Sequence, residues 1–143
     1  MPNWIKNSVS VCVPKGVDKE RLRIFSELVG DDFSFERISP MPEIFIPKWY
    51  ENLTQEEIEK EKIPWNYVPP WYSWRLENWG CKWDASDVTF MYDHNDEVML
   101  SCFFNTPWSP PEPICSKLKL DFPDLLIQWI WYDTDDFQGC FTL

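Results

Sequence analysis

The order of its periodic segments restricts the fold of this chain more than any other feature. Residues 8–13 read Ser-Val-Ser-Val-Cys-Val, and this strict alternation predicts a half-buried strand. A helix is predicted over 18–29, because its apolar residues recur at helical spacing between a capping Asp18 and a terminating Gly30. Period two then returns over 88–92 and 98–105, which predicts a hairpin.

A second helix over 113–120 and an apolar strand over 125–132 complete the order β-α-β-β-α-β. That order predicts the α+β class, and within it a ferredoxin-like sandwich, an antiparallel sheet with its helices on one face. The continuous apolar run of 125–132 indicates a central strand that is covered on both faces. A last strand is expected over 138–143.

The segment 39–82 is rich in tryptophan and proline, and it is expected to be a helical insertion after the first helix of one domain spanning 1–143. A capping-box pattern at Thr54 opens a predicted helix over 54–62, and two prolines precede another over 71–79. Just before the insertion, residues 34–38 are predicted to form a short edge strand.

Charge separates the two halves of the chain. The net charge is −11, and residues 83–143 hold eleven acidic residues against only Lys117 and Lys119. A negative field attracts basic partners and repels phosphate backbones, which disfavours ordinary nucleic-acid binding. Solubility alone explains the charge about equally well.

The cysteines indicate a reducing compartment. Their number is odd, their spacing is irregular, most lie in apolar runs and no pair has the C-x-x-C pattern, so we expect reduced, buried thiols in the cytoplasm. They are Cys12, Cys81, Cys102, Cys115 and Cys140. The first residues have no apolar region typical of a signal peptide, and the longest apolar stretch is too short to cross a bilayer.

Two tryptophan-rich motifs resemble those of a known family. Residues 77–85 read Glu-Asn-Trp-Gly-Cys-Lys-Trp-Asp-Ala, and residues 105–111 read Asn-Thr-Pro-Trp-Ser-Pro-Pro. They are similar to the paired signatures of the YubB-type ferredoxin-like domain of phage and plasmid proteins, and Asn3, Trp4 and Asn7 extend the likeness. The resemblance implies the same fold over most of the chain and a location in the host cytosol. It brings no established catalytic residues.

Six tryptophans cluster in and around these motifs. Exposed rings of this kind can stack on a base, a sugar or a proline-rich peptide. We favour a structural interpretation, in which the rings pack the insertion against one end of the sheet. The six are Trp65, Trp71, Trp74, Trp79, Trp83 and Trp108.

The polar residues of the motifs allow two interpretations. Asp84 or Glu77 could act as a base beside a positive Lys82, but no nucleophile is evident, so a salt bridge that fixes the loop is favoured. The acidic turns at 93–97 and 133–136 lack the glycine and terminal glutamate of an EF-hand loop, and solvated turns are favoured over a metal site. The single histidine, His94, cannot form a usual zinc site.

These patterns favour a non-catalytic interaction protein of a phage or plasmid. We expect its partner to be a basic host or phage protein, and an acidic inhibitor of a host defence or nucleic-acid-handling protein fits the charge. No cofactor, membrane or direct nucleic-acid contact is expected. The alternative is a small-ligand or single-stranded nucleic-acid binder that uses exposed aromatic residues, and an enzyme is the third choice. The expected binding residues are Asp93, Asp96, Glu97, Asp133, Asp135, Asp136, Trp83 and Trp108.

Overall fold

The computed structural model describes residues 3–43, 68–92, 98–133 and 138–141. The strands are β1 (Trp4–Cys12), β2 (Ser86–Tyr92), β3 (Met99–Pro107), β4 (Leu126–Tyr132) and β5 (Gln138–Phe141). The described helices are α1 (Glu20–Val29), α2 (Phe35–Ile38), α4 (Pro70–Asn78) and α5 (Glu112–Asp121). The strand and helix predictions at 8–13, 18–29, 71–79, 88–92, 98–105, 113–120, 125–132 and 138–141 are confirmed as elements, with β1 beginning four residues earlier than predicted and the other ends shifted by one or two residues. Residues 142–143 lie outside the described residues.

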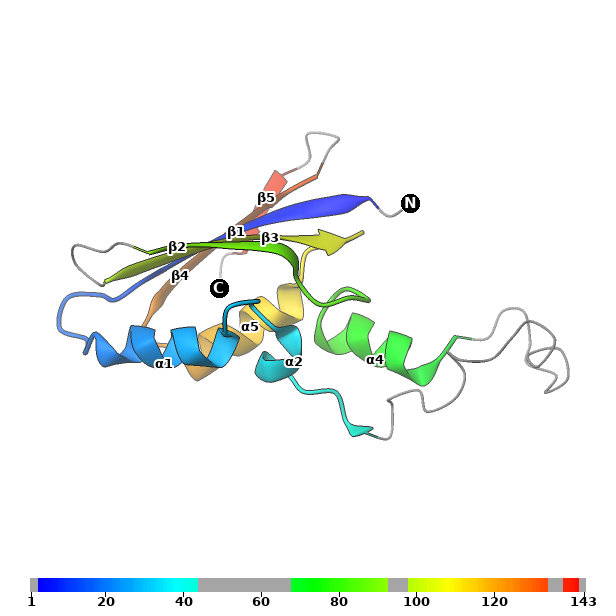
Figure 1. The fold of residues 1–143 in the computed structure, drawn as a ribbon, viewed down its shortest axis with the longest axis horizontal. Helices are drawn as coiled ribbons and strands as arrows, with labels where there is room; N and C mark the ends of the chain where they lie inside the picture. The colour runs from blue at the N-terminus through cyan, green and yellow to red at the C-terminus, as the bar shows by residue number, and fades with distance from the viewer. Residues whose placement is uncertain (1–2, 44–67, 93–97, 134–137, 142–143) are drawn as a thin grey trace, which may run out of the picture.

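The five strands form one antiparallel sheet in the order β2-β3-β1-β4-β5. β1 lies at its centre, where Val9 is opposite Cys102 of β3 on one side and Trp129 of β4 on the other. All four described helices lie on the same side of this sheet (Figure 1). The α+β class and the antiparallel sheet are therefore confirmed.

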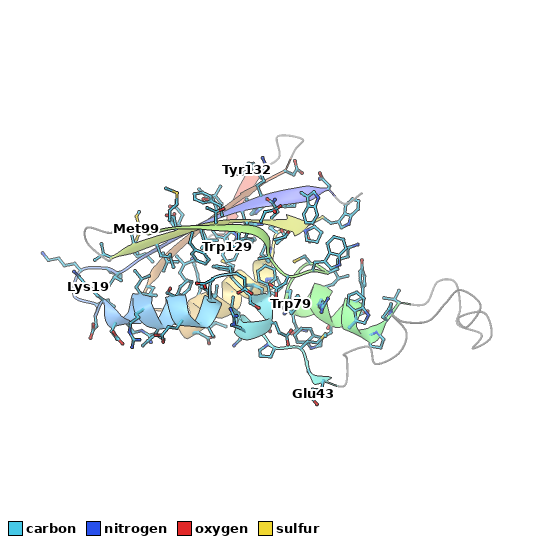
Figure 2. The ribbon with its side chains drawn as sticks, viewed as in Figure 1. Lys19, Glu43, Trp79, Met99, Trp129 and Tyr132 are labelled. Carbon is cyan, nitrogen blue, oxygen red and sulfur yellow. The ribbon has the colours of Figure 1, made fainter. Side chains whose placement is uncertain are left out.

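The core fills the space between the sheet and the helix layer. α1 contributes Leu22, Phe25 and Val29, and the spacing of three and four residues places them on one face of the helix. Figure 2 shows Trp129 of β4 pointing into the same space, whereas Met99 and Tyr132 lie on the other side of the sheet. The sheet thus has a covered inner face and an open outer face.

The prediction of an edge strand at 34–38 is wrong, because Phe35–Ile38 form the short helix α2. The carboxylate of Asp84 accepts hydrogen bonds from the backbone N–H of Phe35 over 2.7 Å and from the hydroxyl of Ser34 over 3.1 Å. A carboxylate at this position satisfies N–H groups that the first turn of a helix cannot pair internally. The helix therefore depends on a residue about fifty positions away.

The prediction that β4 is a central strand covered on both faces is wrong. β1, not β4, is central, and β4 lies between β1 and β5. Trp129 and Ile127 of β4 are buried, but Leu126, Ile130 and Tyr132 on its other face are exposed. Since the described helices all cover one side of the sheet, the alternate residues of β4 stay open to solvent. The predicted helix over 54–62 and His94 lie outside the described residues.

The longest described helices, α1 and α5, have ten residues each. No helix in the described part of the chain has the length and apolar character that a membrane crossing requires.

Candidate functional site

Three tryptophans gather at one end of the sheet, and we call this group the Trp end. It comprises Trp4 at the start of β1, Trp83 before β2, and Trp108 directly after β3. The rings of Trp4 and Trp83 lie 5.9 Å apart, and the register places Trp4 opposite Pro107. Trp83 is 41% exposed and Trp108 is 59% exposed. Trp83 therefore packs in part, against Trp4, whereas most of Trp108 is exposed, so the structural cluster expected from the sequence does not enclose Trp108.

Trp79 does have the structural role that the sequence suggested. Its side chain is only 2% exposed, and its indole N–H donates to the carbonyl of Ser39 over 2.9 Å. The ring packs edge-on against Phe35 and Trp74, at centroid distances of 5.9 and 6.0 Å. The Arg75 guanidinium lies 4.8 Å above it. Trp79 therefore fixes the segment before β2 to the core.

A buried line of hydrogen bonds, which we call the polar chain, runs from the core to the Trp end. The indole N–H of Trp129 donates to the side-chain oxygen of Asn7 over 3.1 Å, and the Asn7 amide donates to the Thr106 hydroxyl over 3.0 Å. Thr106 in turn donates to the carbonyl of Ser109 over 2.8 Å. The Ser109 hydroxyl donates to the carbonyl of Gly80. The two tryptophan motifs of the sequence are therefore joined to each other and to β1.

Gly80 lets the two motif loops approach closely. Its φ is +86°, and a Cβ there would lie 2.9 Å from Pro113 Cδ and 3.1 Å from the Pro110 carbonyl oxygen. Contacts below 3.0 Å to a proline ring require movement of the ring or the backbone. Only glycine fits here without strain.

Trp108 holds a backbone conformation that is rare for large residues. Its φ is +68°, in the left-handed region where a Cβ is crowded. Its N–H donates to the Asn3 carbonyl over 2.7 Å, and Ser109 beside it belongs to the polar chain. The surrounding hydrogen bonds hold this conformation, yet the indole they position is mostly exposed. Phe33 also has a positive φ, of +46°, but is fully buried, so exposure rather than φ alone distinguishes Trp108.

The charged residues of the first motif do not form the predicted salt bridge. Asp84 accepts hydrogen bonds at the start of α2 and from the N–H of Ala85 over 2.8 Å. Lys82 instead places its ammonium group 4.3 Å from the centre of the Trp83 ring. Glu77 is exposed on α4. Asp84 is therefore occupied as a helix cap, and this arrangement offers no support for its use as a general base.

Burial determines the chemistry of three thiols. Burial raises the pKa of Cys81, Cys102 and Cys115 to about 12, and the nearby Asp84 carboxylate contributes at Cys81. Thiols with such pKa values are poor nucleophiles at neutral pH. Cys12 is half-buried and Cys140 is exposed, so the expectation of buried thiols holds for only part of the set.

Among the acidic residues expected to bind, the structure describes only Asp133. It follows Tyr132 of β4, which lies opposite Lys6 at the Trp end of the sheet. Asp93, Asp96, Glu97, Asp135 and Asp136 lie outside the described residues. Tyr92 and Val98, on either side of 93–97, lie at the opposite end of the sheet from Asp133. The described residues contain no group of three or more His, Cys, Asp or Glu side chains that could hold a metal ion.

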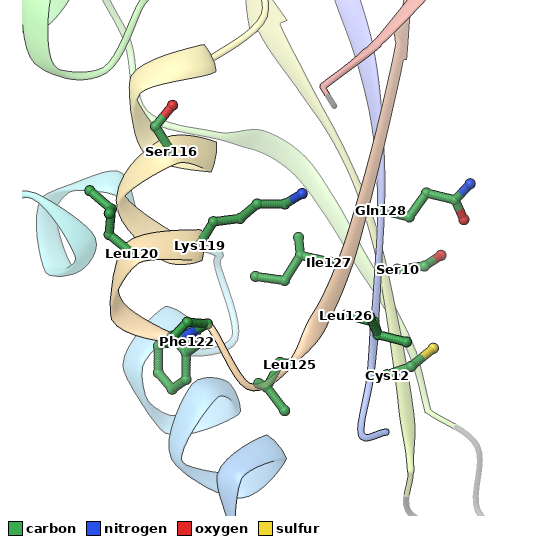
Figure 3. Close-up of a pocket in the computed structure, with 11 residues that line it drawn as sticks. Ser10, Cys12, Ser116, Lys119, Leu120, Phe122, Leu125, Leu126, Ile127 and Gln128 are labelled. Carbon is green, nitrogen blue, oxygen red and sulfur yellow. The ribbon is translucent and has the colours of Figure 1, made fainter. Parts of the chain in front are cut away.

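A shallow hollow of about 860 Å³ lies beside α5, away from the Trp end. Figure 3 shows Lys119 of α5 and Ile127 of β4 pointing into the space between their elements. Its wall also includes Leu126 and Cys12, which belong to the outer face of the sheet. The hollow therefore extends around the first residues of β4, which precede Trp129. The described pairing of β4 with β5 begins at Trp129.

The fold is similar to that of a protein of the DUF1281 family, api92 from Yersinia pseudotuberculosis, in its crystal structure. The TM-score is 0.60 at 9% sequence identity, over 98% of this chain and 93% of that one. This likeness concerns the fold alone. No family model matches the chain, and no curated protein matches it.

Proposed function

We propose that this protein is a non-catalytic protein-binding domain whose contact site is the Trp end. The observation that carries the proposal is Trp108, an exposed indole held at a φ of +68° by the Asn3 carbonyl and the polar chain. Strain that exposes a large ring does not improve packing. It does present the ring in one orientation.

Tryptophan is well suited to such a contact. It is enriched among the few residues that supply most of the energy of protein–protein interfaces, because one ring removes a large apolar area from water. Trp83 is exposed beside Trp108 on a loop fixed by Gly80 and Asp84. Rings held by a rigid backbone lose little conformational entropy on binding.

The proposed partner is a basic protein. Residues 83–143 contain Lys117 and Lys119 against eleven acidic residues, and the described Asp133 lies at the same end of the sheet as the tryptophans. The negative charge of this part of the chain attracts a basic groove and speeds association at low salt. A protein that handles nucleic acid or acts in host defence has such a groove, and the domain is proposed as its acidic inhibitor, encoded by a phage or plasmid.

We also propose that the domain is of the YubB-type ferredoxin-like kind. The strand order β2-β3-β1-β4 and the helices on one face support a ferredoxin-like arrangement, in which β5 is an additional edge strand and 39–82 an insertion. The residues of the two motifs support the resemblance, because the polar chain links them to each other and to β1. They are Asn7, Gly80, Thr106 and Ser109.

The second candidate is stacking of a small ligand or of single-stranded nucleic acid on the same rings. Exposed Trp83 and Trp108, with Lys82 over Trp83, are the observations that favour it. Titration with a single-stranded oligonucleotide, followed by tryptophan fluorescence at physiological salt, separates the two. The acidic field predicts no saturable quenching, and saturable quenching would favour the second candidate.

Capture experiments with matched variants test the main proposal. The tagged full chain, its Trp108→Ala and Trp83→Ala variants, and a Leu76→Ala control would be incubated with lysate of the producing cell and the retained proteins quantified. Leu76 on α4 is 43% exposed, close to the value for Trp83. We expect a basic protein to be retained by the original chain and by the control, and lost from both tryptophan variants. Equal retention by all four chains would contradict the proposal.

A further inference from the structure

The outer face of the sheet carries a patch of large apolar side chains that does not include Trp83 or Trp108, although Trp4 lies at the end of the same face. Six of them are between 38% and 62% exposed. They are Met91, Met99, Phe103, Leu126, Ile130 and Tyr132. Contiguous apolar patches on a protein surface mark places of association. The patch spans β2, β3 and β4 across the central strand β1.

This outer face is almost without charge in a strongly acidic protein. Of the described strand residues that point outward, only Lys6 and Asp87 are charged, and their charges cancel. The net charge of the chain is −11, and a surface that carries part of this negative charge repels a copy of itself. The outer face is where a second copy meets little charge repulsion. It also offers little to a strongly basic or phosphate-rich partner.

The shape of the outer face is complementary to the same face of a second copy. The outward residues in the middle of β1 are small, with Ser8 opposite Phe103 and Ile130, and Ser10 opposite Ser101 and Gln128, whereas Trp4 and Lys6 are large. A short trough therefore lies over the middle of β1, with Phe103 of β3 and Ile130 of β4 on either side of Ser8. In a two-fold stack, the large side chains of one sheet can enter the trough of the other at the usual spacing of about 10 Å.

The size of the face is close to what a stable dimer requires. With strands about 4.8 Å apart and a rise of about 3.3 Å per residue, the five strands project roughly 600 Å². A standard interface buries about 800 Å² of accessible surface per partner. Since side-chain ridges increase the accessible area beyond the projection, the face alone approaches that size.

We infer that the outer face binds a second copy of this chain, giving a two-fold symmetric dimer by sheet-on-sheet packing. The interface is self-complementary, as a two-fold axis requires. It does not involve Trp83 or Trp108, so it is independent of the proposed function. Trp83 and Trp108 of both copies stay available to a partner.

Sedimentation equilibrium of the full chain over a range of concentrations tests the inference. Ile130→Glu places a charge in the centre of the proposed interface, and Ile24→Glu on α1 is its matched control, because Ile24 is 39% exposed and Ile130 is 40% exposed. We expect a dimer whose dissociation constant rises at least about tenfold with Ile130→Glu, a loss of roughly 1.4 kcal/mol, and is unchanged with Ile24→Glu. Trp108→Ala should leave the dimer intact.

The alkylation rate of Cys140 provides a second test, which uses the original chain and requires no substitution. It lies opposite the outward-facing Ile130 and is exposed. In the original chain, its alkylation rate should fall as the protein concentration rises through the dissociation constant. A chain that sediments as a monomer at roughly 1 mM, a dimer equally stable with Ile130→Glu, or a Cys140 rate independent of concentration would each overturn the inference.

Discussion

The amide of Asn7 shows how one buried polar side chain can organise a protein of this size. It is 2% exposed, it accepts from the Trp129 indole and it donates to Thr106, so both ends of the amide are paired. Each pair contributes modestly when formed, but an unpaired buried group costs considerably more. Asn7 thus fixes the core ring and the loop of Trp108 together.

We predict that Asn7→Ala lowers the free energy of unfolding by about 2–4 kcal/mol, because it leaves the buried Trp129 N–H without its acceptor and removes the donor that binds the Thr106 hydroxyl oxygen. Urea denaturation measures this loss. Ser10→Ala is the control on the same strand, since Ser10 faces outward and lies outside the polar chain, and it should change stability by less than about 0.5 kcal/mol. Equal effects of the two substitutions would contradict the role of Asn7.

The buried thiols predict a loss of stability at alkaline pH. Burial raises the pKa of Cys81, Cys102 and Cys115 to about 12 in the folded chain, whereas an unfolded cysteine ionises near a pKa of about 8.5. The unfolded state therefore releases protons first, so their stabilising contribution is complete below about pH 8.5 and is lost as the pH rises toward 12. Denaturation at two pH values measures the loss.

A Cys102→Val variant isolates the thiol from lysines and tyrosines that titrate in the same range. Its stability should fall less steeply between those pH values, and an unchanged slope would contradict the prediction. Iodoacetamide should modify exposed Cys140 in the native protein and reach Cys102 only after unfolding.

At the scale of elements, α2 is a helix whose own sequence is not sufficient to stabilise it. It has four residues, too few to be stable in isolation. The Asp84 carboxylate binds its first N–H groups, and Phe35 packs against Trp79 and Phe104. The helix exists because the strand that begins just after Asp84 is in place.

We predict that Asp84→Ala destabilises the fold by about 1.5–3 kcal/mol, since the N–H groups of Phe35 and Ala85 lose a charged acceptor. Asp84→Asn should cost less, because its side-chain oxygen can still accept. Chemical denaturation gives both values, with Asp31→Ala at an exposed position as control. If Asp84→Ala and Asp31→Ala had the same small effect, the capping role would be refuted.

On the scale of the whole molecule, stability is centred on β1. This strand pairs with β3 along its full length and with β4 from Lys6 to Cys12. Its inward residues Val9 and Val11 are buried under the helix layer. β5, in contrast, pairs only with the second half of β4.

Hydrogen exchange should therefore be slowest in β1, around Val9 to Val11, because those amides open only when the sheet comes apart. β4 should be nearly as slow at Ile127 and Trp129, and β5 should exchange first among the strands. Mass spectrometry of exchanged peptides measures this order. Faster exchange in β1 than in β5 would contradict the strand order.

Sequence patterns correctly predicted the elements with strong periodicity. They gave the wrong secondary structure where contacts with residues distant in the sequence determine it. The alternation at 8–13 and the spacing of Leu22, Phe25 and Val29 were sufficient for β1 and α1. Residues 34–38 were predicted as a strand because the cap of α2 comes from Asp84, which no local pattern reveals.

The candidate site was predicted only in part. The tryptophan motifs indicated the correct region, but exposure of a ring depends on its neighbours in space. Glycines at turns suggest positive φ from sequence, whereas nothing local marks Trp108 for a left-handed backbone. The alternate residues of β4 looked like a second buried face because composition does not tell on which side helices pack.

The hydrogen bond from Trp79 to the Ser39 carbonyl joins two points of the chain and closes a loop. Since both ends are tied at one point, the entropy of closing that loop grows only slowly with its length, by about 0.6 kcal/mol per doubling. α4 within this loop is not free to vary, because Trp74 and Arg75 pack against Trp79. A change in the number of residues before α4 should therefore change stability little as long as α4 and Trp79 keep their sequence.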